Sequence, residues 1–310
     1  MKLGKTFAEE RADDGFSWPA AMAVIGLGLM TALAAFHQGL AGMLHQWSTS
    51  SAYNHAFLIL PISLYLIWER RADLAALRPD PSFRGIGLVL ASGVAWLAAN
   101  SLGIDEGVHF AILGILQGLL LTALGAKVYR LLLFPLSYLW LMVPTGGFLV
   151  APLQTVTAVL STALLKLSAI PVYTEGWTIE VPSGTYFVAR GCAGLNFLLA
   201  SLALALVYGY LVYARPWKRV VAVAAMLSVA ILGNAVRVWG IIALAHLTDN
   251  RIDIVDDHLL YGWGFFSLLL LGMMALGSRF RDEPSAAAPP LFSPGAARPV
   301  LPRLAAAVGL

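Results

Sequence analysis

The stretch Cys192-Ala-Gly-Leu-Asn-Phe-Leu-Leu-Ala-Ser-Leu-Ala-Leu-Ala-Leu-Val-Tyr-Gly-Tyr-Leu-Val-Tyr213 carries no charged residue. A helix of about 20 apolar residues is long enough to cross the hydrocarbon core of a bilayer. Across the whole chain, 59% of the residues are hydrophobic and only 12% are charged, which is too little polar surface to cover a water-soluble globule. The sequence therefore predicts an integral membrane protein.

Apolar runs of similar length recur along the chain. We expect about eight transmembrane helices, near residues 18–36, 52–68, 85–103, 107–124, 128–144, 192–213, 219–246 and 259–277. Acidic residues accompany the basic ones before the first run, which favours a retained signal anchor over a cleaved signal peptide. The predicted fold class is an all-α polytopic membrane protein.

Basic residues gather in alternate loops, after the second, fourth, sixth and eighth runs. The positive-inside rule then places these loops and both termini in the cytoplasm. The net charge is only +3, and the basic residues lie mostly in these short loops. This distribution indicates topology signals and contact with membrane lipids, and it gives no support for a nucleic-acid surface.

Residues 148–170 are apolar enough to cross, but a crossing there would reverse the loop-charge pattern. The segment also contains several polar residues: Gln154, Thr155, Thr157, Ser161 and Lys166. We therefore expect an interfacial or re-entrant helix on the outer face.

Residues 173–188 alternate between apolar and polar side chains around Pro182-Ser183-Gly184, which predicts a short β-hairpin of two strands. Unpaired strand edges are not tolerated in hydrocarbon, so this hairpin belongs in outer water or at the interface, directly before Cys192. Residues 1–283 form the expected membrane domain. Residues 284–310, rich in Pro and Ala, predict a disordered cytoplasmic tail.

Cys192 is the only cysteine, so it has no intrachain disulfide partner and cannot belong to a cage of several thiolates. Two interpretations remain: an inert small hydrophobe or a nucleophile. A free thiol has a pKa of about 8.5 and is mostly protonated at neutral pH. A nucleophilic cysteine needs a base such as imidazole to take its proton and a cation such as guanidinium to stabilise the negative charge.

Arg237 and His258 supply those two groups. Arg237 lies 18 residues beyond Arg219, roughly 27 Å along a helix, and so near the far edge of the hydrocarbon core. Cys192 and His258 begin their runs at the same outer face. Each residue also has an alternative interpretation. Arg237 is then a structural ion-pair partner or the ligand of a transporter. His258 is then part of a helix cap.

Four further residues are supporting candidates. Asn234 shares a helix face with Arg237 and is predicted either to orient it or to bind a neighbouring helix. His55 begins the second run at the outer face and is predicted to be either a positioning group or an ordinary interfacial histidine. Arg190 and Gly194 flank Cys192 in the sequence. Nothing in the sequence resembles a metal-ligand or cofactor motif.

The residues also carry a family resemblance. The segments Leu167–Gly184, Val188-Ala-Arg-Gly-Cys-Ala-Gly-Leu-Asn-Phe197, Gly233-Asn-Ala-Val-Arg-Val238 and Asp257-His-Leu-Leu-Tyr-Gly-Trp263, with an earlier one at Tyr53–Trp68, occur in order. Together they resemble the signature of the exosortase family, over residues 47–266.

This resemblance implies a sortase-like cysteine transpeptidase of the bacterial inner membrane with its active site facing the periplasm. Its partners would be exported proteins with a carboxy-terminal sorting signal: a short motif such as Pro-Glu-Pro, a transmembrane helix and a basic tail. By position, Cys192 matches the family's nucleophile, Arg237 its arginine and His258 its histidine. Ala193, Asn196 and Arg190 depart from the residues that many members carry, which leaves the subtype and the recognised motif open.

Two other classes of function remain as alternatives. A transporter would use Arg237 as a ligand, but it would be expected to show repeated halves and broken helices near the midplane. A non-catalytic exopolysaccharide-assembly factor would use the same fold as a binding module.

Overall fold

The computed structural model describes residues 16–249 and 258–282, and these residues form two compact units. The first contains the described residues up to Thr49 together with Ala56–Pro144. The second contains Ser50–His55 and the described residues from Thr145 onward. The expected tail at 284–310 lies outside the described residues.

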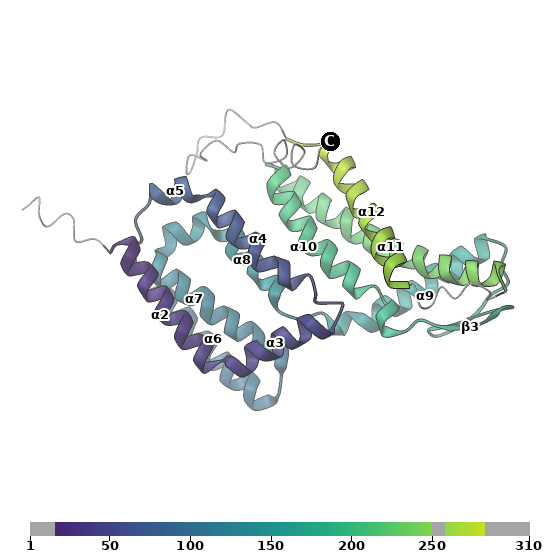
Figure 1. The fold of residues 1–310 in the computed structure, drawn as a ribbon, viewed down its shortest axis with the longest axis horizontal. Coiled ribbons are helices and arrows are strands. Elements are labelled where there is room, and N and C mark those ends of the chain that lie inside the picture. The colour runs from purple at the N-terminus through teal and green to yellow at the C-terminus, as the bar shows by residue number, and fades with distance from the viewer. Residues whose placement is uncertain (1–15, 250–257, 283–310) are drawn as a thin grey trace, which may run out of the picture. The chain divides into compact units, whose positions relative to one another are not determined.

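The first unit is entirely helical among its described residues. Its elements are α2 (Trp18–Ala35), α3 (His37–Thr49), α4 (Ala56–Glu69), α5 (Arg71–Ala75), α6 (Phe83–Leu102), α7 (Asp105–Leu131), α8 (Leu133–Tyr138) and the 3₁₀ turn η2 (Leu139–Met142). α7 packs against α6, α2 and α3, so it forms the centre of this unit (Figure 1).

The second unit joins helices to a small sheet. Its elements are η3 (Gly147–Leu149), α9 (Val150–Leu167), β1 (Tyr173–Glu175), β2 (Thr178–Val181), β3 (Gly184–Phe187), η4 (Arg190–Cys192), α10 (Leu195–Val212), α11 (Pro216–Leu247) and α12 (His258–Ser278). α11 packs against α9, α10 and α12 (Figure 1). The cysteine turn η4 lies between the sheet and α10.

Six helices of the described chain are long and apolar enough to cross a membrane: Trp18–Ala35, Phe83–Leu102, Asp105–Leu131, Gly147–Leu167, Arg190–Val212 and Pro216–Leu247. Shorter apolar helices cover Ala56–Glu69, Leu133–Met142 and Gly264–Ser278. The all-α multi-pass fold is therefore confirmed. The helix at 147–167 is long and apolar enough either to cross the membrane or to lie at its interface. Its expected interfacial position therefore stays a prediction.

The helix expected over residues 128–144 is wrong as a single element. α7 is kinked at Gly125, whose φ of 76° is not helical, so the run expected at 107–124 does end there. The part of α7 after the kink stops at Leu131, and the remainder is divided between α8 and η2. Pro135 accounts for the break, because proline lacks the N–H that bonds within a helix interior and is tolerated best in the first turn. α8 begins at Leu133, which places Pro135 in its first turn.

The hairpin is present, but it has three strands. β2 and β3 pair antiparallel across the predicted turn, and β1 adds a further antiparallel strand to β2 in the order β1-β2-β3. The sheet packs through Ile179 and Val181 onto α9 and onto the final turns of α11, at Val238 and Ile242. Since α11 has 32 residues, it extends over about 48 Å, beyond a hydrocarbon core of about 30 Å.

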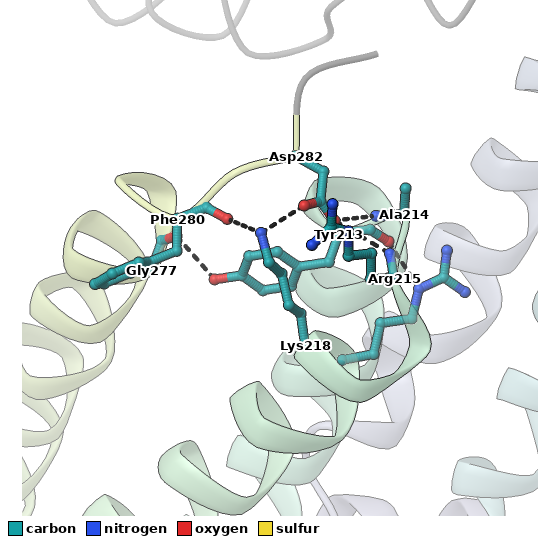
Figure 2. Close-up of polar contacts among 8 residues, drawn as sticks. Tyr213, Ala214, Arg215, Lys218, Gly277, Phe280 and Asp282 are labelled. Atoms are coloured by element: carbon teal, nitrogen blue, oxygen red, sulfur yellow. Dashed lines mark hydrogen bonds and ion pairs between the residues drawn. The ribbon is translucent and has the colours of Figure 1, made fainter. Parts of the chain in front are cut away.

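Polar contacts join the ends of α10 and α12 to the start of α11 (Figure 2). Oδ2 of Asp282 accepts hydrogen bonds from the backbone N–H groups of Ala214 at 3.0 Å and Arg215 at 3.1 Å. The Lys218 ammonium donates to Asp282 Oδ1 and to the Phe280 carbonyl. Asp282 thus connects the α10–α11 loop with the end of α12.

Candidate active site

Cys192 closes a short 3₁₀ turn between the sheet and α10. The sheet ends where the Val188 N–H donates to the Trp177 carbonyl at 2.9 Å, and the Cys192 N–H then donates to the Ala189 carbonyl at 2.9 Å. Cys192 is half-buried and packs against the apolar cluster formed by the sheet, α9 and α11. The thiol therefore belongs to a turn that is fixed on both sides by regular structure.

Asn234 binds this turn directly. Its Nδ2 donates to the Cys192 carbonyl and to Thr157 Oγ1, each at 2.9 Å. Gly194, which precedes α10 with φ 84°, allows the approach, because a β-carbon there would be 2.7 Å from Asn234 Cγ. The structure therefore brings together Cys192, Gly194 and Asn234, three of the residues that the sequence singled out.

Arg237 lies on the same face of α11, three residues after Asn234. It is buried, with 6% of its surface exposed, and its Cζ lies 5.8 Å from the centre of the Phe197 ring. Its Nε is buried and has no hydrogen-bond partner among the described residues. A buried guanidinium is costly unless an anion or acceptor compensates it, so this position suits a group that meets negative charge during a reaction.

His258 is the first residue of α12, and its side chain lies outside the described residues. Gly262, four residues later, sits against the Arg237 guanidinium: a β-carbon built on it would be 3.1 Å from Nε. The backbone of α12 at Gly262 therefore adjoins Arg237.

His55 lies in the segment Ser50–His55, which belongs to the second unit. Its Nδ1 is 3.2 Å from the Ala52 carbonyl, and Ala52 packs with Ala193 and Leu195 beside the cysteine turn. Arg190 is in the same turn as Cys192, but its side chain is exposed. The segment of His55 is thus close to the turn, whereas Arg190 faces solvent or lipid.

Sequence reasoning used the polar residues of α9 only as a sign of an interfacial helix and gave them no part in the site. Gln154, Thr157 and Ser161 are all buried, with 2%, 2% and 0% of their surfaces exposed. Gln154 Nε2 donates to the Val188 carbonyl at 2.7 Å, and Ser161 Oγ donates to the Ala235 carbonyl at 3.0 Å. Their spacing of three and four residues was the available signal, because it places them on one helix face.

An apolar cavity in the second unit lies apart from the cysteine turn. Within residues 16–249 and 258–282, no group of three or more His, Cys, Asp or Glu side chains is arranged to hold a metal ion. A cavity of about 360 Å³ lies among α10, α11 and α12, but it is lined by residues such as Tyr208 and Trp217. These lie near the opposite end of α10 from Cys192, so the cavity is separate from the cysteine turn.

The fold and the site define a helical multi-pass membrane protein in which one cysteine turn is attached to a helix bearing a buried arginine. A family model described as Transmembrane exosortase (Exosortase_EpsH) matches residues 47–275, and the chain therefore belongs to the transmembrane exosortase family. Members are membrane-embedded enzymes of protein sorting that act on exported proteins. Comparison with curated proteins and with solved structures gave no significant match.

Proposed function

We propose that this protein is a cysteine transpeptidase that cleaves carboxy-terminal sorting signals of exported proteins, with Cys192 as nucleophile, Arg237 as electrostatic stabiliser and His258 as general base and acid. The observation that carries the proposal is the double hydrogen bond of Asn234. It fixes the Cys192 carbonyl to the face of α11 on which Arg237 lies one turn later.

The chemistry follows from these groups. His258 accepts the thiol proton, and the Cys192 sulfur attacks the carbonyl carbon of the scissile peptide bond. The guanidinium of Arg237 stabilises the oxyanion that forms. The C–N bond then breaks, the proton passes to the leaving amine, and the substrate's amino-terminal part remains on sulfur as a thioester.

An acceptor resolves the thioester. An amine or another envelope nucleophile attacks the thioester carbonyl, the C–S bond breaks, and the sulfur takes up a proton to regenerate the thiol. With water as the acceptor, the same steps give hydrolysis. Both routes require only a nucleophile on the side of the membrane that contains the cysteine turn.

The loop charges support a site on the outer side of the membrane with both termini in the cytoplasm. For a bacterial exosortase, the membrane to which the family resemblance points, that side is the periplasmic face of the inner membrane. The sheet supports the same side, since its strand edges require water or the interface and it directly precedes Cys192. Because the chain has a single thiol, a membrane-impermeant maleimide reports its side of the membrane without any engineered background. Labelling of spheroplasts from outside is expected, and labelling only of inverted vesicles would contradict this orientation.

The activity is tested by co-expression with an exported protein that carries a sorting motif, a transmembrane helix and a basic tail. Cys192→Ala, Arg237→Ala and His258→Ala are each expected to abolish processing without reducing the amount of protein in the membrane. Cys192→Ala has a matched control in Ala193→Ser, a small change at the adjacent buried position. Full processing by Cys192→Ala would exclude the proposed nucleophile.

A further inference from the structure

Two buried carboxamides hold the turn that carries Cys192, one at each end. Gln154 of α9 donates to the Val188 carbonyl at 2.7 Å, and Asn234 of α11 donates to the Cys192 carbonyl at 2.9 Å. The two carbonyls are four residues apart, at the end of the sheet and at the cysteine itself. Between them, the Cys192 N–H donates to the Ala189 carbonyl at 2.9 Å, which is a local bond within the turn.

A third side chain links the two helices behind the turn. Thr157 Oγ1 accepts the second hydrogen bond of Asn234 at 2.9 Å. Gln154 and Thr157 are three residues apart and therefore share one face of α9. A single helix face thus binds the turn directly through Gln154 and indirectly through Thr157 and Asn234.

Packing alone does not require these polar groups. All three are at most 2% exposed, and a buried carboxamide costs free energy unless it is hydrogen-bonded. Apolar side chains of similar volume would fill the same space at an apolar helix interface. The amides instead bind two backbone carbonyls of an irregular turn, which gives that turn a fixed path.

We propose that Gln154 and Thr157 are positioning residues for the Cys192 thiol. By fixing the carbonyls of Val188 and Cys192, they and Asn234 set the direction in which the cysteine side chain leaves the backbone. This inference rests on the proposed nucleophilic role of Cys192. Displacing a reacting atom by about 1 Å lowers a rate about 10²-fold, so the effect falls on kcat.

The test uses the full-length protein in detergent or vesicles and three near-isosteric variants. Gln154→Met removes the amide that binds the Val188 carbonyl, and Thr157→Val removes the hydroxyl that accepts the second hydrogen bond of Asn234. Thr155→Val is the matched control on the same helix. Among the described residues, Thr155 Oγ1 accepts from the Trp177 indole at 3.0 Å and donates to the Ala151 carbonyl at 3.1 Å, and neither partner belongs to the cysteine turn. Each variant is measured for kcat and KM of processing, for melting temperature, and for the rate of Cys192 alkylation by a maleimide.

We expect kcat to fall about 10- to 100-fold in Gln154→Met and Thr157→Val, with KM within about two-fold. The rate of Cys192 alkylation is expected to change about five-fold or more in these two variants. Thr155→Val is expected to stay near wild type in kcat and in alkylation rate. A purely structural role would lower the melting temperature and the amount of folded protein without changing the alkylation rate of the folded fraction.

Unchanged alkylation in both variants overturns the proposal, whether or not processing falls. If Gln154→Met does not fold, Thr157→Val decides by the same readouts. Continued processing by Cys192→Ala would instead refute the proposed function, in which Cys192 is the nucleophile. Because alkylation needs no substrate, the two failures are distinguishable.

Discussion

A β-carbon built on Gly262 of α12 would lie 3.1 Å from Nε and 3.6 Å from Cζ of Arg237 in α11. The guanidinium therefore packs directly against the backbone of α12, one turn after His258. Arg237 is 6% exposed, so the guanidinium has little room to move away. The position of this charge depends on the absence of a side chain at residue 262.

Gly262→Ala tests this dependence. The added methyl group forces the guanidinium to shift by a few tenths of an ångström. We expect processing to fall about 3- to 10-fold, because the charge is moved away from the place where the oxyanion develops. Gly264→Ala is the control on the same helix, since a β-carbon there has no neighbour within 4 Å. Equal processing by the two variants would show that the position of the guanidinium is not critical.

Gly194→Ala is expected to disturb the other side of the site. Residue 194 has φ 84°, and a β-carbon would be 2.7 Å from Asn234 Cγ, so the substitution adds backbone strain and displaces the amide that binds the Cys192 carbonyl. We expect a strong loss of processing and an altered rate of thiol alkylation.

The matched control is Gly191→Ala in the same turn. A β-carbon at residue 191 has no neighbour within 4 Å, so this variant is expected to retain processing. If Gly191→Ala and Gly194→Ala lose activity equally, general disorder of the turn explains the loss better than displacement of Asn234 does.

Much of the site could be predicted from the sequence because helix geometry is regular. The spacing of Asn234 and Arg237 on one face follows from the helical repeat. The position of Cys192 between a polar segment and a long apolar run already indicated the end of a helix. The structure adds that Asn234 binds the cysteine turn directly; the sequence had offered orientation of Arg237 or contact with a neighbouring helix.

The rest depends on contacts between distant residues. Gln154 binds the carbonyl of Val188, 34 residues away, and no local pattern specifies which carbonyl a buried amide will meet. The third strand was missed because Gly176 and Trp177 interrupt an otherwise even alternation, and β1 pairs with β2 only after the chain turns at that point. Hydropathy likewise did not reveal the break at Pro135, because α8 and η2 are as apolar as a continuous helix.

Arg237→Lys distinguishes charge from geometry. Lysine keeps the positive charge but loses the planar group that lies over Phe197 and against Gly262, and the two cations are not interchangeable where a fixed fork of donors is needed. We expect processing to fall about 10²-fold, as measured with the co-expressed substrate. Arg219→Lys is the control near the start of the same helix, where Arg219 Nε donates to the Tyr213 carbonyl. Near-normal processing by Arg237→Lys would show that charge alone is sufficient.

Asp282 is expected to hold the end of α12 against the α10–α11 loop. Hydrogen bonding from the Lys218 ammonium, followed by that from the Arg215 N–H, lowers the pKa of Asp282 below its usual 3.8. A lowered pKa means that the stabilising contribution is fully present above pH 3.8 and is lost as the pH falls through the lowered value. At neutral pH, Asp282→Ala should therefore speed hydrogen exchange at the amides of Ala214 and Arg215. Asp282→Asn keeps an oxygen acceptor without the charge, so its exchange should lie between wild type and Asp282→Ala; unchanged protection in Asp282→Ala would mean that the loop is held by other contacts.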